Sequence, residues 1–97
     1  MRIIAEKTLK DYWTKHAEVQ GQLEAWLEHV SRATWTKPAD VQAEYGEDII
    51  LPGDRAVFNI KGNQYRMVVK IHYKSQIVFI RFIGTHKEYD RINALEV

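Results

Sequence analysis

The chain has 97 residues and a formal net charge of +1, with 45% apolar residues, 28% charged residues and no cysteine. This length suits one domain, 1–97, and the composition is that of a globular protein rather than a disordered one. Without cysteine, disulfides and thiolate metal sites are excluded, and no apolar run is long enough to cross a membrane. Since the N-terminus also lacks a secretory signal, we expect a cytoplasmic protein without a membrane partner.

The charges are divided unevenly along the chain. Residues 1–54 hold 6 Lys/Arg and 10 Asp/Glu, whereas residues 55–97 hold 8 Lys/Arg and 3 Asp/Glu. The two parts therefore carry formal charges of −4 and +5. A basic C-terminal half favours a polyanionic partner, but two oppositely charged halves can equally attract each other within the fold.

The N-terminal half is predicted to be mainly helical. After a short strand over 1–4, apolar residues at helical spacing predict a first helix over about 6–16. The strongest periodic pattern predicts a second amphipathic helix over 19–30. We expect its Trp26, and Trp13 of the first helix, to pack on a sheet.

A third, short helix is predicted to begin near Pro38, because proline is favoured at an early helical position.

From Arg55 onward the apolar pattern changes from a helical to an alternating period. The alternating segments predict three strands joined by turns. These strands cover 55–61, 65–73 and 77–83, and a closing helix is expected over 86–95.

The predicted order is β-α-α-(α)-β-β-β-α, which is typical of an α+β fold with a mainly antiparallel sheet. The N-terminal helices are expected to cover one face of that sheet, and strand alternation directs Tyr65 toward them. The opposite, open face is predicted to be basic. Its residues are expected to be Asn59, Lys61, Arg66, Lys70 and His72.

Arg66 is the first candidate for chemistry on the predicted basic face. It lies early in a strand whose other face is strongly apolar, and Lys61 and Asn59 lie across a hairpin from it. Such an arginine is a candidate phosphate clamp, because guanidinium binds phosphate in a bidentate geometry. The alternative is a row of solvated charged residues, which is common on sheets.

The second candidate is His86, which follows Gly84 and Thr85 at the end of the last predicted strand. Histidine transfers protons near neutral pH, and Tyr89 and Asp90 share a helical face with it. Spacing alone favours a simpler structure, in which Thr85 caps a helix and His86 is a surface residue. No pattern of metal ligands and no phosphate-binding loop is present, so no metal and no cofactor are expected.

The chain also resembles the HigB-like toxins of bacterial type II toxin–antitoxin systems, which belong to the RelE superfamily of mRNA interferases. Several motifs in one order carry this resemblance, over nearly the whole chain. They cover 1–5, 9–13, 35–41, 57–63, 65–69 and 80–90.

The resemblance implies a RelE-like fold and a ribosome-dependent endoribonuclease that cuts translated mRNA without a metal. In the implied reaction a ribose 2′-hydroxyl attacks the adjacent phosphate and the 5′-oxygen leaves, which requires acid–base catalysis and cations. The implied partners are mRNA on the ribosome and a helix-turn-helix, HigA-like antitoxin, which would also provide the link to operator DNA.

The resemblance assigns Arg66 to the scissile phosphate and His86 to proton transfer, with Lys61 stabilising charge and Tyr89 or Asp90 orienting the histidine. The remaining predicted RNA contacts are Asn59, Lys70, Arg81 and Lys87. Two alternatives stay open. One is a non-catalytic RNA- or ribosome-binding inhibitor of translation, and the other is an inactive relative that only forms complexes with its antitoxin.

Overall fold

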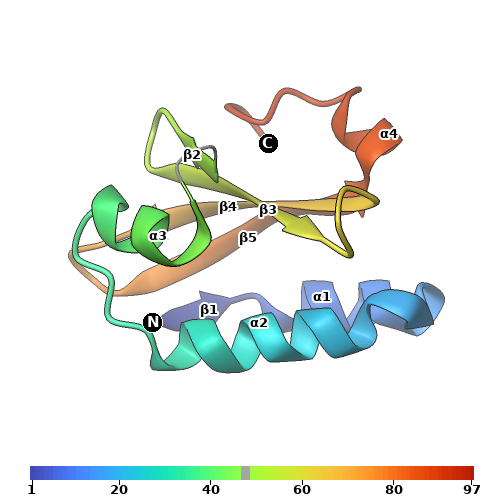
Figure 1. Cartoon of the computed structure of the whole chain (residues 1–97), viewed down its shortest axis with the longest axis horizontal. Coiled ribbons are helices and arrows are strands. Elements are labelled where there is room, and N and C mark those ends of the chain that lie inside the picture. The colour runs from blue at the N-terminus through green and yellow to red at the C-terminus, as the bar shows by residue number, and fades with distance from the viewer. Residues whose placement is uncertain (47–48) are drawn as a thin grey trace.

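The computed structural model describes residues 1–46 and 49–97, which form a five-stranded sheet with two long helices beneath it (Figure 1). The strands are β1 (Arg2–Ile4), β2 (Ile50–Leu51), β3 (Arg55–Ile60), β4 (Tyr65–His72) and β5 (Ile77–Thr85). The helices are α1 (Glu6–Lys15), α2 (Gln20–Arg32), α3 (Pro38–Tyr45) and α4 (His86–Tyr89), with a 3-10 turn over Ala17–Val19.

The strand order is β1-β5-β4-β3-β2. β1 runs parallel to β5, whereas the pairs β5–β4, β4–β3 and β3–β2 are antiparallel. The predicted α+β fold with a mainly antiparallel sheet and N-terminal helices on one face is therefore confirmed. β2 was not predicted, because two residues are too few to show an alternating pattern.

The core lies between the sheet and the helices α1 and α2. Trp26 packs edge-on against Phe58 of β3, with ring centroids 5.4 Å apart, and Tyr65 is buried as predicted. Trp13 is only half-buried, at the groove between α1 and α2. Each large apolar side chain buried here contributes about 1.5–3 kcal/mol, so this layer provides most of the driving force for folding.

The predicted N-terminal helices form close to their expected bounds. Pro38 occupies the start of α3, and Gly46 ends it with a φ of 98°, a conformation that suits glycine. Among the described residues, no helix has the length and apolar character needed to span a bilayer.

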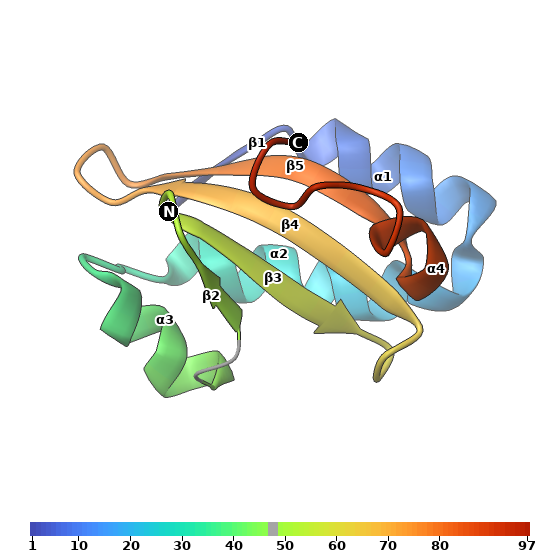
Figure 2. The ribbon, with the colours of Figure 1, turned by 90° about the horizontal axis from the view of Figure 1, so that it is seen from above.

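The face of the sheet opposite the helices is not open along its whole length, contrary to the prediction. The predicted closing helix over 86–95 ends at Tyr89, and residues 90–97 continue as an irregular segment that lies over the sheet (Figure 2). We call residues 90–97 the C-terminal strap. Val57 and Val68 on this face are only 7% and 0% exposed, because the strap lies over this side.

The closing helix stops early because local hydrogen bonds compete with helical ones. Ile92 N donates to Tyr89 O at 3.2 Å, a tighter spacing than in an α-helix. Three residues later, Leu95 N donates to the side-chain Oδ1 of Asn93 at 3.0 Å. Asparagine commonly breaks helices in this way.

The predicted position of Lys61 on this face is wrong, and a bulge sets the position of Arg81, for which the sequence predicted no face. Lys61 lies beyond the end of β3, in the hairpin turn, with a φ of 54°. In β5 the register passes from Val68↔Phe82 to Val69↔Ile80, so that Arg81 is the extra residue of a bulge. A bulge shifts the alternation of every residue beyond it, so strand parity alone could not place Arg81.

Candidate functional site

The site is built where β5 ends and α4 begins. Thr85 is the N-cap of α4, because its Oγ1 accepts from Glu88 N at 3.1 Å while its own N donates to Glu88 Oε1 at 2.8 Å. This reciprocal capping box confirms the predicted cap. The Thr85 N–H, and then the Thr85 side chain, lower the pKa of the Glu88 carboxyl.

His86, the first residue of α4, pairs with Asp90. The distance from His86 Nδ1 to Asp90 Oδ2 is 3.2 Å, one helical turn along the chain. The backbone also holds the histidine in place, since His86 N donates to Gln64 O in the β3–β4 hairpin at 3.0 Å. Both side chains remain accessible, with 44% and 59% of their surface exposed, so a substrate can reach them.

Arg66 and Tyr89 form the second half of the site. The Arg66 Cζ lies 4.9 Å from the centroid of the Tyr89 ring, a cation–π contact between β4 and α4. The Phe82 ring packs beside the Tyr89 ring, and the two ring centroids are 6.4 Å apart. Arg66 Nε is buried and has no hydrogen-bond partner within the part of the chain that the structure describes.

Gly84 makes room for this arrangement. It is the strand partner of Arg66, and a Cβ atom at Gly84 would lie 2.6 Å from Phe82 Cζ and 3.1 Å from Glu88 Oε1. Any larger residue would therefore displace the Phe82 ring, which flanks Tyr89. The glycine that the sequence placed just before the cluster serves close packing and not backbone flexibility.

The structure brings four of the predicted site residues together, namely Arg66, His86, Tyr89 and Asp90. Asn59 is the strand partner of Arg66 on its other side and is exposed. The other predicted contacts lie farther away or are engaged elsewhere. Lys70 is exposed near the far end of β4, Lys87 is exposed on α4, Lys61 lies in the hairpin turn, and Arg81 binds the strap.

Arg55 is not among the residues predicted for the basic face, although strand parity places it on the same face as Val57 and Asn59. Its Nη1 donates to Ala94 O at 3.2 Å and to Val97 O at 2.7 Å. Arg81 Nε donates to the same Val97 O at 3.0 Å. Two arginines from different strands therefore hold the strap. The alternating position of Arg55 in β3 was the signal that could have placed it on this face.

A second polar cluster lies on the helix side of the sheet. His16 stacks on Tyr12 with ring centroids 4.1 Å apart, and the Tyr65 hydroxyl donates to Glu18. Burial raises the pKa of Tyr12 to about 12, so its hydroxyl is protonated near neutral pH. We interpret this cluster as packing between α1 and the hairpin. Within residues 1–46 and 49–97, no three His, Cys, Asp or Glu side chains are grouped as a metal ion requires.

Comparison with known proteins identifies the class of protein that carries this fold and site. The family profile described as "RelE-like toxic component of a toxin-antitoxin system", the HigB toxin family, matches residues 19–92. Since the match spans well over half of the chain, the chain belongs to this family. A toxic component of this kind has an antitoxin as its partner.

Individual relatives are similar over almost their whole length. The mRNA interferase toxin HigB of Escherichia coli (strain K12) is 31% identical over 97 residues, which cover 98% of this chain and 93% of the relative. The mRNA interferase HigB of Shigella flexneri matches with the same identity and coverage. The resemblance inferred from the sequence motifs is therefore confirmed.

Proposed function

We propose that this toxin is an mRNA endoribonuclease whose site is formed by Arg66, His86, Tyr89 and Asp90. The observation that carries the proposal is the contact of the Arg66 guanidinium with Tyr89, which lies in the same one-turn helix as His86 of the accessible His86–Asp90 pair. A cation next to an acid–base pair is what cleavage of a phosphodiester requires. The names of the relatives, which are mRNA interferases, support the same activity.

The unpartnered Nε of Arg66 supports a phosphate ligand. A buried N–H without an acceptor costs about 1–3 kcal/mol, and an arginine left in this state is expected to have an acceptor when substrate is bound. Phosphate oxygens are well matched to the guanidinium donors. Stacking on Tyr89 restricts the orientation of the guanidinium before RNA arrives.

In the proposed reaction a ribose 2′-oxygen forms a bond to the adjacent phosphorus while the bond from phosphorus to the 5′-oxygen breaks. His86 transfers protons, either from the attacking 2′-hydroxyl or to the leaving 5′-oxygen, and Asp90 orients its imidazole. Arg66 stabilises the negative charge that develops on the phosphate. The proposed roles of Lys61 and of the RNA contacts Asn59, Lys70, Arg81 and Lys87 stay predictions.

We further propose that residues 1–97 act as one domain, in the cytoplasm, on mRNA held by the ribosome. The finer features of the partner also belong to this proposal. We expect a helix-turn-helix antitoxin that neutralises the toxin and links it to operator DNA.

The test is induction of the chain and its variants in bacterial cells, followed by sequencing of RNA 5′ ends. The parent is expected to arrest growth and to produce new 5′ ends within translated mRNA. His86→Ala and Arg66→Ala are each expected to lower cleavage by about a hundredfold or more, as for loss of an acid–base group or of charge stabilisation.

Matched controls separate a site effect from the loss of any histidine or arginine. His72 is exposed near the far end of β4, and Arg32 is exposed on α2, where it pairs with Glu28 at 3.1 Å. His72→Ala and Arg32→Ala are expected to cut as the parent does. Full growth arrest by both His86→Ala and Arg66→Ala would refute the assignment. Arrest with intact mRNA would favour the non-catalytic inhibitor instead.

A further inference from the structure

A cleft adjoins the proposed site. Its walls are Tyr89 and Asp90 at the end of α4, Leu51 and Pro52 after β2, and residues 92–95 of the C-terminal strap. The cleft has a volume of about 510 Å³, within the range of roughly 300–1,000 Å³ that is usual for small-ligand sites. Because Tyr89 and Asp90 belong to both the cleft and the site, anything in the cleft lies beside the reacting phosphate.

The outer wall of the cleft is held in a defined position. Arg55 of β3 and Arg81 of β5 converge on the backbone oxygen of Val97, at 2.7 Å and 3.0 Å respectively. Arg55 also binds Ala94 O at 3.2 Å, next to the strap residues that line the cleft. These two arginines thus fix the strap. Figure 2 shows the strap lying over the sheet.

The strap presents one apolar and one polar group to the cleft. Leu95 is 49% exposed and lines the cleft, so its apolar side chain is available to contact a ligand there. Asn93 lines the same cleft, and its Oδ1 accepts from Leu95 N at 3.0 Å. This bond orients the amide, so that its NH₂ group provides donors for a ligand.

We propose that this cleft binds the nucleobase next to the scissile phosphate, and that Asn93 and Leu95 determine which base is preferred there. This inference rests on the proposed function, because it places part of the same RNA substrate. A nucleobase has flat apolar faces that pack against aromatic and aliphatic side chains, and a polar edge that asparagine reads by hydrogen bonds. The continuity of the cleft with Tyr89 and Asp90 favours this occupant over a segment of the antitoxin.

The experiment compares the bases around the cut sites in cells that express the parent, Asn93→Ala or Leu95→Ala, by sequencing of RNA 5′ ends. Each variant is expected to keep cutting, but its preference for a base at one position beside the cut falls by about tenfold. Glu96→Ala is the matched control, because Glu96 is an exposed strap residue that does not line the cleft. It is expected to keep the parental preference.

Three outcomes would overturn the inference and leave the proposed function in place. The first is an unchanged base preference in both variants while the parent cuts, which would leave the proposed function intact. The second is an equal loss of cutting at every base, which would make the strap a structural support only. The third is weaker neutralisation by a co-expressed antitoxin with unchanged base preference, which would assign the cleft to the antitoxin. If the parent itself produces no new 5′ ends, the proposed function and the cleft both fail.

Discussion

At the scale of single residues, the contact between Arg66 and Tyr89 decides how the site is organised. Arg66 comes from the middle of the chain and Tyr89 from its end, and the guanidinium lies 4.9 Å from the ring centroid. Gly84 permits Phe82 to flank the same ring. We therefore expect Tyr89 to act through its ring, as a support for the cation, at least as much as through its hydroxyl.

If Tyr89 supports Arg66 through its ring, two substitutions of Tyr89 should differ in their effect on cleavage. Tyr89→Phe keeps the ring under Arg66 and is expected to retain most of the cleavage, whereas Tyr89→Ala is expected to lose it largely. Loss of the cation–π contact should also lower the free energy of unfolding of Tyr89→Ala by about 1 kcal/mol in urea denaturation. If Tyr89→Phe is as inactive as Tyr89→Ala, the hydroxyl takes part in proton transfer and the ring is not the main contribution.

At the scale of elements, α4 is one turn long and depends on its cap. An isolated helix of this length has little stability of its own, so the Thr85–Glu88 capping box and the bond from His86 N to Gln64 O hold it in place. The strap that follows is held by Arg55 and Arg81. The site thus lies on a short segment that is fixed at both ends.

The capping box makes stability depend on pH in a defined direction. Hydrogen bonds from Thr85 lower the pKa of Glu88 in the folded protein, so the stabilisation is complete above the pKa of an unfolded glutamate. It is lost as the pH falls through the lowered, folded-state pKa. The stability difference between the parent and Glu88→Gln is therefore expected to shrink from about pH 7 to about pH 3.

Urea denaturation at each pH measures this difference. Glu24→Gln is a suitable control, because Glu24 is an exposed glutamate on α2 that lies beyond the first turn of that helix. Its difference from the parent is expected to stay nearly constant over the same range. A Glu88→Gln difference that grows toward low pH would contradict the proposed role of the carboxylate in the cap.

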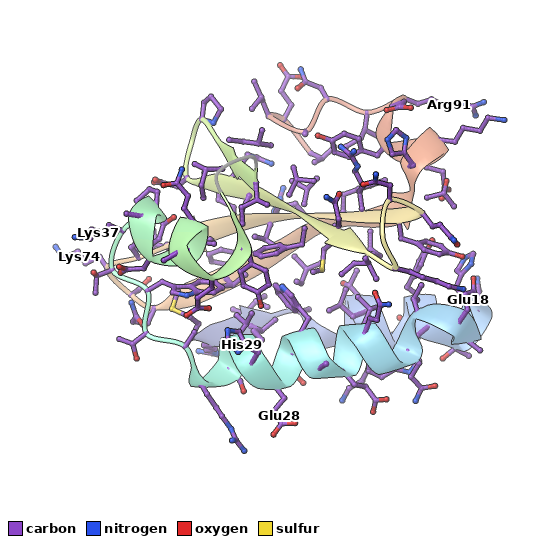
Figure 3. All side chains as sticks on the ribbon, in the orientation of Figure 1. Glu18, Glu28, His29, Lys37, Lys74 and Arg91 are labelled. Atoms are coloured by element: carbon purple, nitrogen blue, oxygen red, sulfur yellow. The ribbon has the colours of Figure 1, made fainter. Side chains whose placement is uncertain are left out.

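At the scale of the whole molecule, the two charged halves of the sequence form different layers. Figure 3 shows Glu28 projecting from α2 away from the sheet, and Arg91 projecting from the α4 side of the molecule. Each of the six ion pairs found among the described residues joins two residues of the same half. The structure therefore favours a polyanion as the partner of the basic half over neutralisation by the acidic half.

The small net charge of +1 limits how tightly this surface holds RNA by itself. With Arg55 and Arg81 bound to the strap, few cations remain beside Arg66. We therefore expect purified protein to cut naked mRNA far more slowly than mRNA on translating ribosomes, when both are measured in the same buffer. Equal rates on the two substrates would contradict the proposed ribosome dependence.

Features that depend on neighbouring residues were predicted well from the sequence. Examples are the apolar stripe of α2, the alternation of β3 and β4, and the N-cap Thr85. Each depends on contacts within a few residues or on the regular repeat of apolar side chains along one element. The wrong predictions concern the strand position of Lys61 and the helix expected after Tyr89. Lys61 lies in a turn instead of a strand, and local hydrogen bonds end the helix at Tyr89, after which Arg55 holds the strap from a distant strand.

The sequence by itself determined the family, the α+β layout and the residues His86 and Arg66 as candidates, because these depend on motifs and periodicity. Only the tertiary structure decided which arginines bind the strap and which one contacts Tyr89. Arg55 and Arg81 share the sign of Arg66, yet they hold the strap, whereas the Arg66 guanidinium stacks on Tyr89. The physical reason is that the role of a cation depends on the acceptors that the fold brings within reach. Val97 lies 31 residues after Arg66, and this distance along the chain does not show which arginine will reach it.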